Sequence, residues 1–288
     1  MGAEDTRTAA VLDPAPDPPR SAPLGRLLGA ELRWVLRRPR TLVMLGLFAA
    51  VPVLISIGVA VAAERGPGLI GAIGGNGLVL PVAAMTLSLA LLLPLAVAMA
   101  AADAIAGEAA HGTLRGLLLS PVGRLRLVGM KAFGVLVVAA LATSVIAVVG
   151  VVAGLVVVGG AQGQLVTLSG TAVGLGEALA RVALVVAWVV GQLAAIGAVA
   201  LAISSVTEHP LVVLASVLGG LIVFGVLAAI PALDWLQPWL LTSGWTAGAD
   251  ALRDPVPLGG MIESSLRALC YVAVGAGLTT YRMLRRDA

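Results

Sequence analysis

Charged residues are scarce in this sequence: Asp, Glu, Lys and Arg make up 11% of its 288 residues, whereas 59% are hydrophobic. Soluble domains carry roughly twice that charged fraction. A chain with so few charges could not cover its own surface in water, and its mean hydropathy is +1.05. Its 36 glycines show no G-X-Y period, which excludes collagen. These absences exclude a soluble globule, a disordered chain and a fibre, and they predict a membrane protein.

Reactive side chains are also few. The single cysteine, Cys270, cannot form an intramolecular disulfide, and the two histidines, His111 and His209, have no metal-ligating companions at a useful spacing. The only lysine, Lys131, follows RLVGM and not a glycine-rich phosphate loop. Aromatic residues amount to 3%, and no basic patch with interleaved aromatics is present, so nucleic acid is not predicted as a partner. We expect no catalytic, cofactor-binding or metal-binding residue in this chain, and no enzyme activity.

Long runs without charged residues divide the chain into spans. Five such runs between residues 41 and 233 are 23 to 45 residues long, and a sixth, at 268–281, has 14. A helix needs about 20 residues to cross the hydrocarbon core of a bilayer. The portions 66–77 and 159–174 are rich in glycine and polar residues, so the two longest runs are each expected to hold one span. The sequence therefore predicts an all-α membrane protein with six transmembrane helices, at about 41–63, 78–105, 132–158, 179–203, 210–232 and 262–283.

Basic residues are distributed unevenly between the two sides of this topology. Fourteen of the 18 Lys and Arg residues fall before the first span, between spans two and three, or after the last span. By the positive-inside rule these segments face the cytoplasm. The loop at 204–210 has no Lys or Arg, so only the alternation of the spans across the membrane places it on the cytoplasmic side. We expect a multi-pass protein of the cytoplasmic membrane with both termini inside.

The first 38 residues divide into two parts. Residues 1–20 mix Pro, Ala, Asp and Arg without periodicity and are expected to be a disordered cytoplasmic tail before a membrane domain at 21–288. Over 21–38 an apolar stripe that includes Leu28 lies opposite Arg33 and Arg37, with Trp34 suited to the headgroup layer. This pattern predicts an amphipathic helix on the inner membrane surface. The alternative is a solvated charged helix.

The segment between spans two and three also has helical periodicity. Leu114, Leu117 and Leu118 recur at i, i+3 and i+4, and Pro121 suits the first turn of a second helix. A short amphipathic helix here is either an element of the membrane surface or a docking piece for a partner.

Glu108 stands at the end of span two, where the helix dipole disfavours an anion. We expect a cation to hold it, either Arg115, Arg124, Arg126 or one from a partner. A solvated acid on the inner face is the alternative.

Groups that could couple transport to an ion gradient are nearly absent from the expected spans. Gln192 is the main polar side chain near a helix centre, and either a helix-to-helix hydrogen bond or a role in a substrate path would explain it. Gly150 and Gly154 would permit close helix packing, within one subunit or between two. Active transport by this chain therefore requires work supplied by another subunit.

One set of residues around the second loop forms a recognisable pattern. It comprises an acid at the end of span two, a GTLR turn, a leucine pair, a proline, an arginine and a lysine: Glu108, Gly112, Thr113, Leu114, Arg115, Leu117, Leu118, Pro121, Arg124 and Lys131. Together with the blocks at 166–181, 203–210, 233–245 and 252–255, this pattern resembles the type-2 ABC exporter permeases, in their bacterial permease-subunit branch, over roughly 21–286.

The resemblance implies a surface helix before the first span, a short cytoplasmic coupling helix at 112–120 braced by Glu108, and a re-entrant segment at the outer leaflet within 233–266. Its partners would be a cytosolic ABC ATPase subunit, which binds ATP and Mg²⁺, a second permease chain in a homo- or heterodimer, and membrane lipid. Residues implied in coupling to the ATPase are Glu108, Gly112, Thr113, Leu114, Arg115, Leu117, Leu118, Pro121 and Arg124. The surface helix would use Leu28, Arg33, Trp34 and Arg37, and the re-entrant segment Trp235, Pro238, Trp239 and Trp245, with its tryptophans at headgroup level.

The sequence thus predicts the membrane subunit of an ATP-driven exporter, without identifying its solute. A gradient-driven carrier and a membrane scaffold that transports nothing are the alternatives. One departure from the family pattern concerns the sixth span, where Glu263 and Arg267 lie in an expected membrane helix. A pair of charges four residues apart, facing the protein, would accommodate them.

Overall fold

The computed structural model describes residues 25, 29, 32, 33, 37, 39–63, 76–110, 123–158 and 165–285. Six helices within these residues are long and apolar enough to cross a membrane. They span Pro39–Val61, Leu92–Ala110, Arg124–Val158, Leu175–Ser204, Pro210–Ala228 and Gly259–Arg285. The prediction of an all-α membrane protein with six spans is confirmed.

Within the described ranges the elements are helices, apart from one small hairpin. In order they are α2 (Pro39–Ala63), η1 (Gly77–Val79), α4 (Leu80–Leu89), α5 (Leu92–Ala102), η2 (Asp103–Gly107), α6 (Glu108–Ala110), α8 (Arg124–Ala153), η3 (Gly154–Val158), β1 (Leu165–Val166), β2 (Ala172–Val173), α9 (Leu175–Ser204), α10 (Pro210–Ala228), η5 (Pro231–Trp239), η6 (Leu241–Leu252) and α11 (Gly259–Arg285). Strands β1 and β2 pair antiparallel, with Leu165 opposite Val173. Both η2 and η3 are π-helical turns.

The helix between residues 80 and 110 is interrupted at Ala90 and Leu91. Leu91 has φ −151° and ψ −50°, outside the helical region. In an unbroken helix the ring of Pro94 would meet the carbonyl of Ala90, four residues earlier, and would offer it no N–H. The region expected as one span at 78–105 is therefore built from α4 and α5, and the helix continues through η2 and α6 to Ala110.

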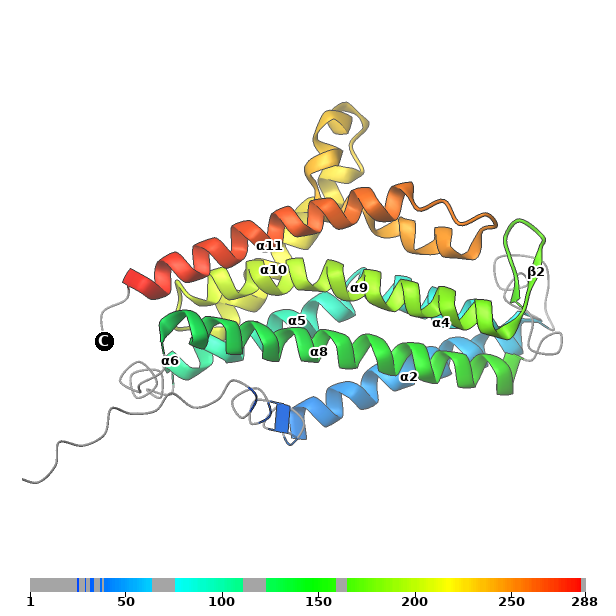
Figure 1. The fold of residues 1–288 in the computed structure, drawn as a ribbon, viewed down its shortest axis with the longest axis horizontal. Helices are drawn as coiled ribbons and strands as arrows, with labels where there is room; N and C mark the ends of the chain where they lie inside the picture. Colours follow the sequence, from blue (N-terminus) through cyan, green and yellow to red (C-terminus); the bar gives the residue numbers. More distant parts are fainter. Residues whose placement is uncertain are drawn as a thin grey trace, which may run out of the picture.

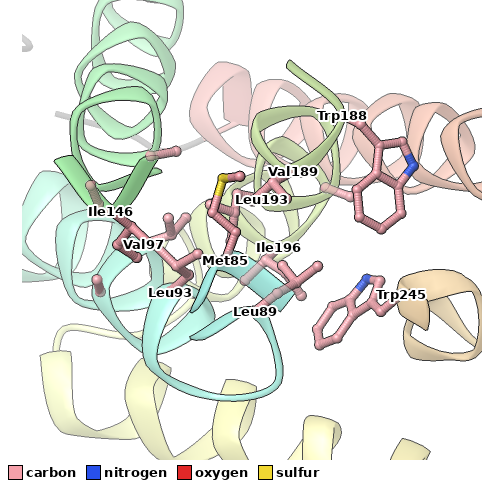
Figure 2. Packing of buried hydrophobic residues seen from close by; sticks show 14 of the residues in the cluster. Met85, Leu89, Leu93, Val97, Ile146, Trp188, Val189, Leu193, Ile196 and Trp245 are labelled. Atoms are coloured by element: carbon pink, nitrogen blue, oxygen red, sulfur yellow. The ribbon is translucent and has the colours of Figure 1, made fainter. Parts of the chain in front are cut away.

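Helix α9 occupies the centre of the bundle and packs against α5, α8, α10 and α11. Its buried side chains include Val189, Leu193 and Ile196, which meet Met85 and Leu89 of α4 in the packed core (Figure 2). Uncharged helix faces can pack closely in this way. In a bilayer their association displaces lipid and not water, so dispersion between the packed side chains stabilises the fold.

The contact between α8 and the α4 region is close enough to require glycine. A Cβ on Gly150 would lie 2.8 Å from Cα of Pro81, and one on Gly154 would collide with the backbone of Gly77. Of the two roles open to the Gly150 and Gly154 pair, the structure shows packing within one subunit.

The peripheral helices expose apolar side chains. Helix α10 is the most exposed of the six described spans, and the span that contains α5 is the most buried. Leu211 and Val212 of α10 are 78% and 48% exposed. In a bilayer such faces meet lipid or another apolar helix.

The two ends of the bundle are distinct (Figure 1). One end, called the hairpin end here, carries β1, β2 and the first turns of α9 and α11. The other, called the α6 end, carries α6, the start of α8 and the last turns of α11. The chain around η5 projects sideways from the bundle (gold in Figure 1), whereas η6 packs against α9 and α11.

Candidate coupling site

Glu108 and Lys131 form an ion pair at the α6 end. Lys131 Nζ donates to Glu108 Oε1 at 2.5 Å, and the two side chains are only 6% and 15% exposed. Glu108 begins α6 and Lys131 lies in the second turn of α8, so the pair joins the helices that precede and follow residues 111–122. Breaking a buried pair leaves a charge poorly compensated, so this contact fixes the two helices together.

Lys131 is a partner of Glu108 that the sequence did not suggest. Of the cations expected there, Arg115 lies outside the described residues, and Arg124 donates to the end of α11. Lys131 precedes the long uncharged run of the third span, and nothing in the sequence places its ammonium beside α6. The expectation that a cation holds Glu108 is confirmed.

A second ion pair lies beside the first. Arg40 Nη1 donates to Asp103 Oδ2 at 2.7 Å, which joins the start of α2 to η2. The Arg40 side chain is 65% exposed, so solvent screens this contact and its net contribution to stability is small. It still places the first span against the end of the second.

Arg124 caps the last turn of α11. Its Nη1 donates to the carbonyl oxygens of Met283 and Leu284, at 3.0 Å and 2.9 Å. These carbonyls belong to the final turn, where a helix lacks its own donors. Arg124, predicted as part of the coupling region, therefore connects α8 to the last span.

Most of the predicted coupling residues lie outside the described residues. These are Gly112, Thr113, Leu114, Arg115, Leu117, Leu118 and Pro121. Of the predicted surface helix, the side chains of Leu28 and Trp34 are likewise outside, while Arg33 and Arg37 are exposed and Arg33 Nε donates to the carbonyl of Gly29 at 3.2 Å. The coupling and surface helices remain predictions.

The region 233–266, predicted to be re-entrant, contains η5, η6 and the first turns of α11, and its place in the outer leaflet stays a prediction. Trp235 and Trp239 are 70% and 71% exposed on η5, and Pro238 lies within the same element. Trp245, expected with them at headgroup level, is only 8% exposed and packs in the core near Trp188 (Figure 2). Trp245 thus differs from the other two, because η6 turns back against α9 and α11.

Arg267 and Glu263 form the pair that the sixth span requires. Arg267 Nη2 lies 2.9 Å from Glu263 Oε1, and its Nη1 donates to the carbonyl of Leu240 and to Ser243 Oγ. The arginine is 10% exposed and faces η6, whereas Glu263 is 70% exposed. The charge of Arg267 is therefore compensated by Glu263 and by polar groups of η6, near the hairpin end of α11.

Arg181 anchors the hairpin end of α9, a role that the sequence did not indicate. Its guanidinium donates to Glu177 Oε1, to Asp254 Oδ1 at 3.1 Å and to the carbonyls of Ala251 and Arg253 at 3.3 Å and 2.8 Å. The hydroxyl of Thr171 donates to the other oxygen of Asp254. The hairpin, α9 and the chain between η6 and α11 are therefore joined at one point.

Gln192 is fully buried in α9. Neither its amide nitrogen nor its oxygen has a hydrogen-bond partner among the described residues. The helix-to-helix hydrogen bond considered from the sequence is therefore not formed there, and the side chain does not line an open path. Groups of three or more His, Cys, Asp or Glu that could hold a metal are not found within the described residues.

Comparison with protein families identifies the chain. Residues 27–207 match the model described as ABC-2 family transporter protein. The comparison with curated proteins finds no match. The matched region contains the Glu108 and Lys131 pair and four of the six spans. Since the match covers more than half of the sequence, the chain belongs to the ABC-2 family of ABC transporter permeases.

Proposed function

We propose that this chain is the membrane-spanning subunit of an ATP-driven exporter, and that a separate cytosolic ABC ATPase supplies the work through residues 112–120. The observation that carries the proposal is the buried Glu108 and Lys131 pair, which joins the two helices on either side of that segment. A force applied to the segment is then passed to the second and third spans together. Family membership supports the partnership with an ATPase subunit.

In this proposal the α6 end faces the cytoplasm. In the six-span topology, the segments before the first span, between spans two and three, and after the last span lie on one side of the membrane, the side of the α6 end. These segments carry most of the basic residues, which favour the cytoplasm. The protein would lie in the cytoplasmic membrane, with η5 and η6 in the outer leaflet.

We propose further that two permease chains, identical or different, form the pathway between them. The exposed apolar faces of α2 and α10 support this arrangement, since they offer surface to a second chain as well as to lipid. ATP-driven closure of two ATPase subunits would then press on both coupling segments and bias the permease pair between two arrangements.

The position of the charges favours this scheme over a gradient-driven carrier. In the described part of the chain, Arg40, Asp103, Glu108 and Lys131 lie toward the α6 end, and the pairs of Arg181 and Arg267 lie toward the hairpin end. Proton or sodium coupling needs titratable or cation-binding groups within the membrane. The work is therefore assigned to the partner.

The docking assignment is tested by replacing Leu117→Asp and Leu118→Asp in the permease co-expressed with its ATPase subunit. We expect the ATPase to be lost on purification while the permease remains inserted. Leu168→Asp is the matched control, because Leu168 is a 60% exposed leucine next to β1 at the other end of the bundle. Retention of the ATPase by the double variant contradicts the assignment.

The alternative functions predict different results in liposomes. A gradient-driven carrier moves solute from this chain alone under an imposed ion gradient and without ATP. A scaffold supports no transport with either source of energy. The exporter proposed here needs both ATP and the partner subunit.

A further inference from the structure

The turn that leads from α5 to α6 is π-helical, and a side chain from another span is inserted in it. In an α-helix the N–H of Ala106 would donate to the carbonyl of Ala102, four residues earlier. Here the N–H of Ala106 donates instead to Ser204 Oγ at 2.9 Å, and the same oxygen lies 3.5 Å from the Ala102 carbonyl oxygen. The hydroxyl of Ser204 thus stands between the two backbone groups that would otherwise bond to each other.

This position explains why the turn has π geometry. A group inserted in the i to i−4 ladder opens the helix and accommodates one additional residue. Ser204 is the last residue of α9, it is fully buried, and its hydroxyl both accepts from Ala106 and points at Ala102. The backbone of η2 and the end of the central helix are therefore joined without any charge.

The additional residue determines which way α6 faces. One residue corresponds to about 100° of rotation in an α-helix. If the Ala106 to Ala102 bond reformed, residues after Ala106 would turn by about that angle relative to α5. Glu108 would then leave Lys131, whereas Asp103, the first residue of η2, precedes Ala106 and would keep its contact with Arg40.

We propose that Ser204 is a positioning residue that keeps Glu108 in register with Lys131 and so sets the direction in which α6 faces at the end of the second span. The proposal rests on the proposed function only where it connects α6 to the coupling segment that follows it in sequence. Ser204 acts through the backbone of η2, and its own side chain touches neither Glu108 nor Lys131 by any hydrogen bond described.

The test measures the register of α6 in the full-length chain in nanodiscs, without an ATPase or a solute. Glu108→Cys and Lys131→Cys are introduced with Cys270→Ala, and a short bismaleimide bridges the two thiols. We expect efficient bridging with Ser204 present, its loss in Ser204→Ala, and its recovery in Ser204→Thr, which retains a hydroxyl. Ser205→Ala is the matched control, because Ser205 is also buried but donates only to Ala202 in its own helix.

Two further variants keep the test decisive if Ser204→Ala folds poorly. Deletion of Ala104 removes the additional residue, so α6 should keep its direction without the hydroxyl, and the deletion combined with Ser204→Ala should restore bridging. An Arg40→Cys and Asp103→Cys pair should bridge equally in every background. Unchanged bridging between positions 108 and 131 in Ser204→Ala, or no recovery on deletion of Ala104, would overturn the proposal.

A second readout separates this proposal from the proposed function. In the complex with the ATPase subunit, Ser204→Ala should weaken binding of that subunit and Ser204→Thr should restore it. Loss of bridging together with unchanged ATPase binding would uphold the role of Ser204 in the register of α6, and it would contradict the assignment of residues 112–120 as the coupling segment.

Discussion

Arg181 and Ser204 stand near opposite ends of α9 and hold it by different kinds of contact. Arg181 makes charge-assisted hydrogen bonds to two carboxylates and two backbone carbonyls. Ser204 contributes one neutral hydroxyl between two backbone groups of the neighbouring span. Charge-assisted bonds are about twice as strong as neutral ones.

The difference lies in what can replace each contact. Without the guanidinium, Glu177, Asp254 and the nearby carbonyls have no equivalent donor on α9 within the described residues. Without the hydroxyl, Ala106 and Ala102 can bond to each other as in any α-helix. The hairpin end is therefore a fixed anchor, whereas the α6 end, on the proposal made above for Ser204, has a second backbone arrangement open to it. This asymmetry would suit the proposed exporter, in which the ATPase acts on the α6 end alone.

The largest effect on stability is expected from Arg181→Met. The replacement removes the charge-assisted hydrogen bonds of a buried guanidinium to two partly exposed carboxylates and two backbone carbonyls, and should lower the free energy of unfolding by about 3 kcal/mol. Thermal unfolding in detergent measures it. Arg253→Met is the matched control, since that side chain is 60% exposed and its 3.5 Å pair with Asp250 is screened by solvent. Equal shifts for the two variants would contradict the anchor.

The next largest loss of stability is expected from Gly154→Val, because a branched side chain would force apart the backbones of η3 and η1 at the hairpin end. Overpacking of this kind costs about 2 kcal/mol. Gly129→Val in α8 is the control, as a Cβ at Gly129 meets nothing within 4 Å. The measurement is again the melting temperature. If the glycine contact is unimportant, both valine variants will melt alike.

Gln192→Met tests the middle of α9, between the two ends. The buried amide of Gln192 is without hydrogen-bond partners among the described residues, so an apolar side chain of similar size removes a desolvation cost. We expect stability to rise by about 1 kcal/mol. A fall in the melting temperature would show that the amide has a partner in the assembled transporter.

The smallest effect on stability is expected from Ser204→Ala. The backbone bond that reforms offsets the lost hydroxyl, so the free energy of unfolding should change by less than about 1 kcal/mol. Ser204→Ala and Arg181→Met should therefore rank in opposite orders in melting temperature and in binding of the ATPase subunit. The same order in both measurements would remove the distinction between the two ends of α9.

The six spans could be predicted from the sequence because length and hydropathy are local properties. The i,i+4 pair of Glu263 and Arg267 could be predicted for the same reason. Pro94 alone does not predict the interruption at Ala90 and Leu91, since a proline in a membrane helix can also be accommodated by neighbouring helices. Local pattern thus fixes which segments are helical and leaves their continuity open.

The contacts that define the candidate site required the fold. Lys131 and Glu108 are 23 residues apart, and Ser204 and Ala106 are 98 residues apart. Serine at the end of a helix is common and signals nothing by itself. Trp245 resembled Trp235 and Trp239 in sequence, and only the packing of η6 against α9 separates a core residue from two surface residues.

The most direct test of the account is ATP hydrolysis and transport by this chain in liposomes, with and without its ABC ATPase subunit. We predict that the permease alone hydrolyses no ATP and sustains no pumping under an imposed ion gradient, and that both hydrolysis and ATP-dependent transport appear when the partner is added. Hydrolysis of ATP, or uphill transport, by the purified chain without a partner would contradict it.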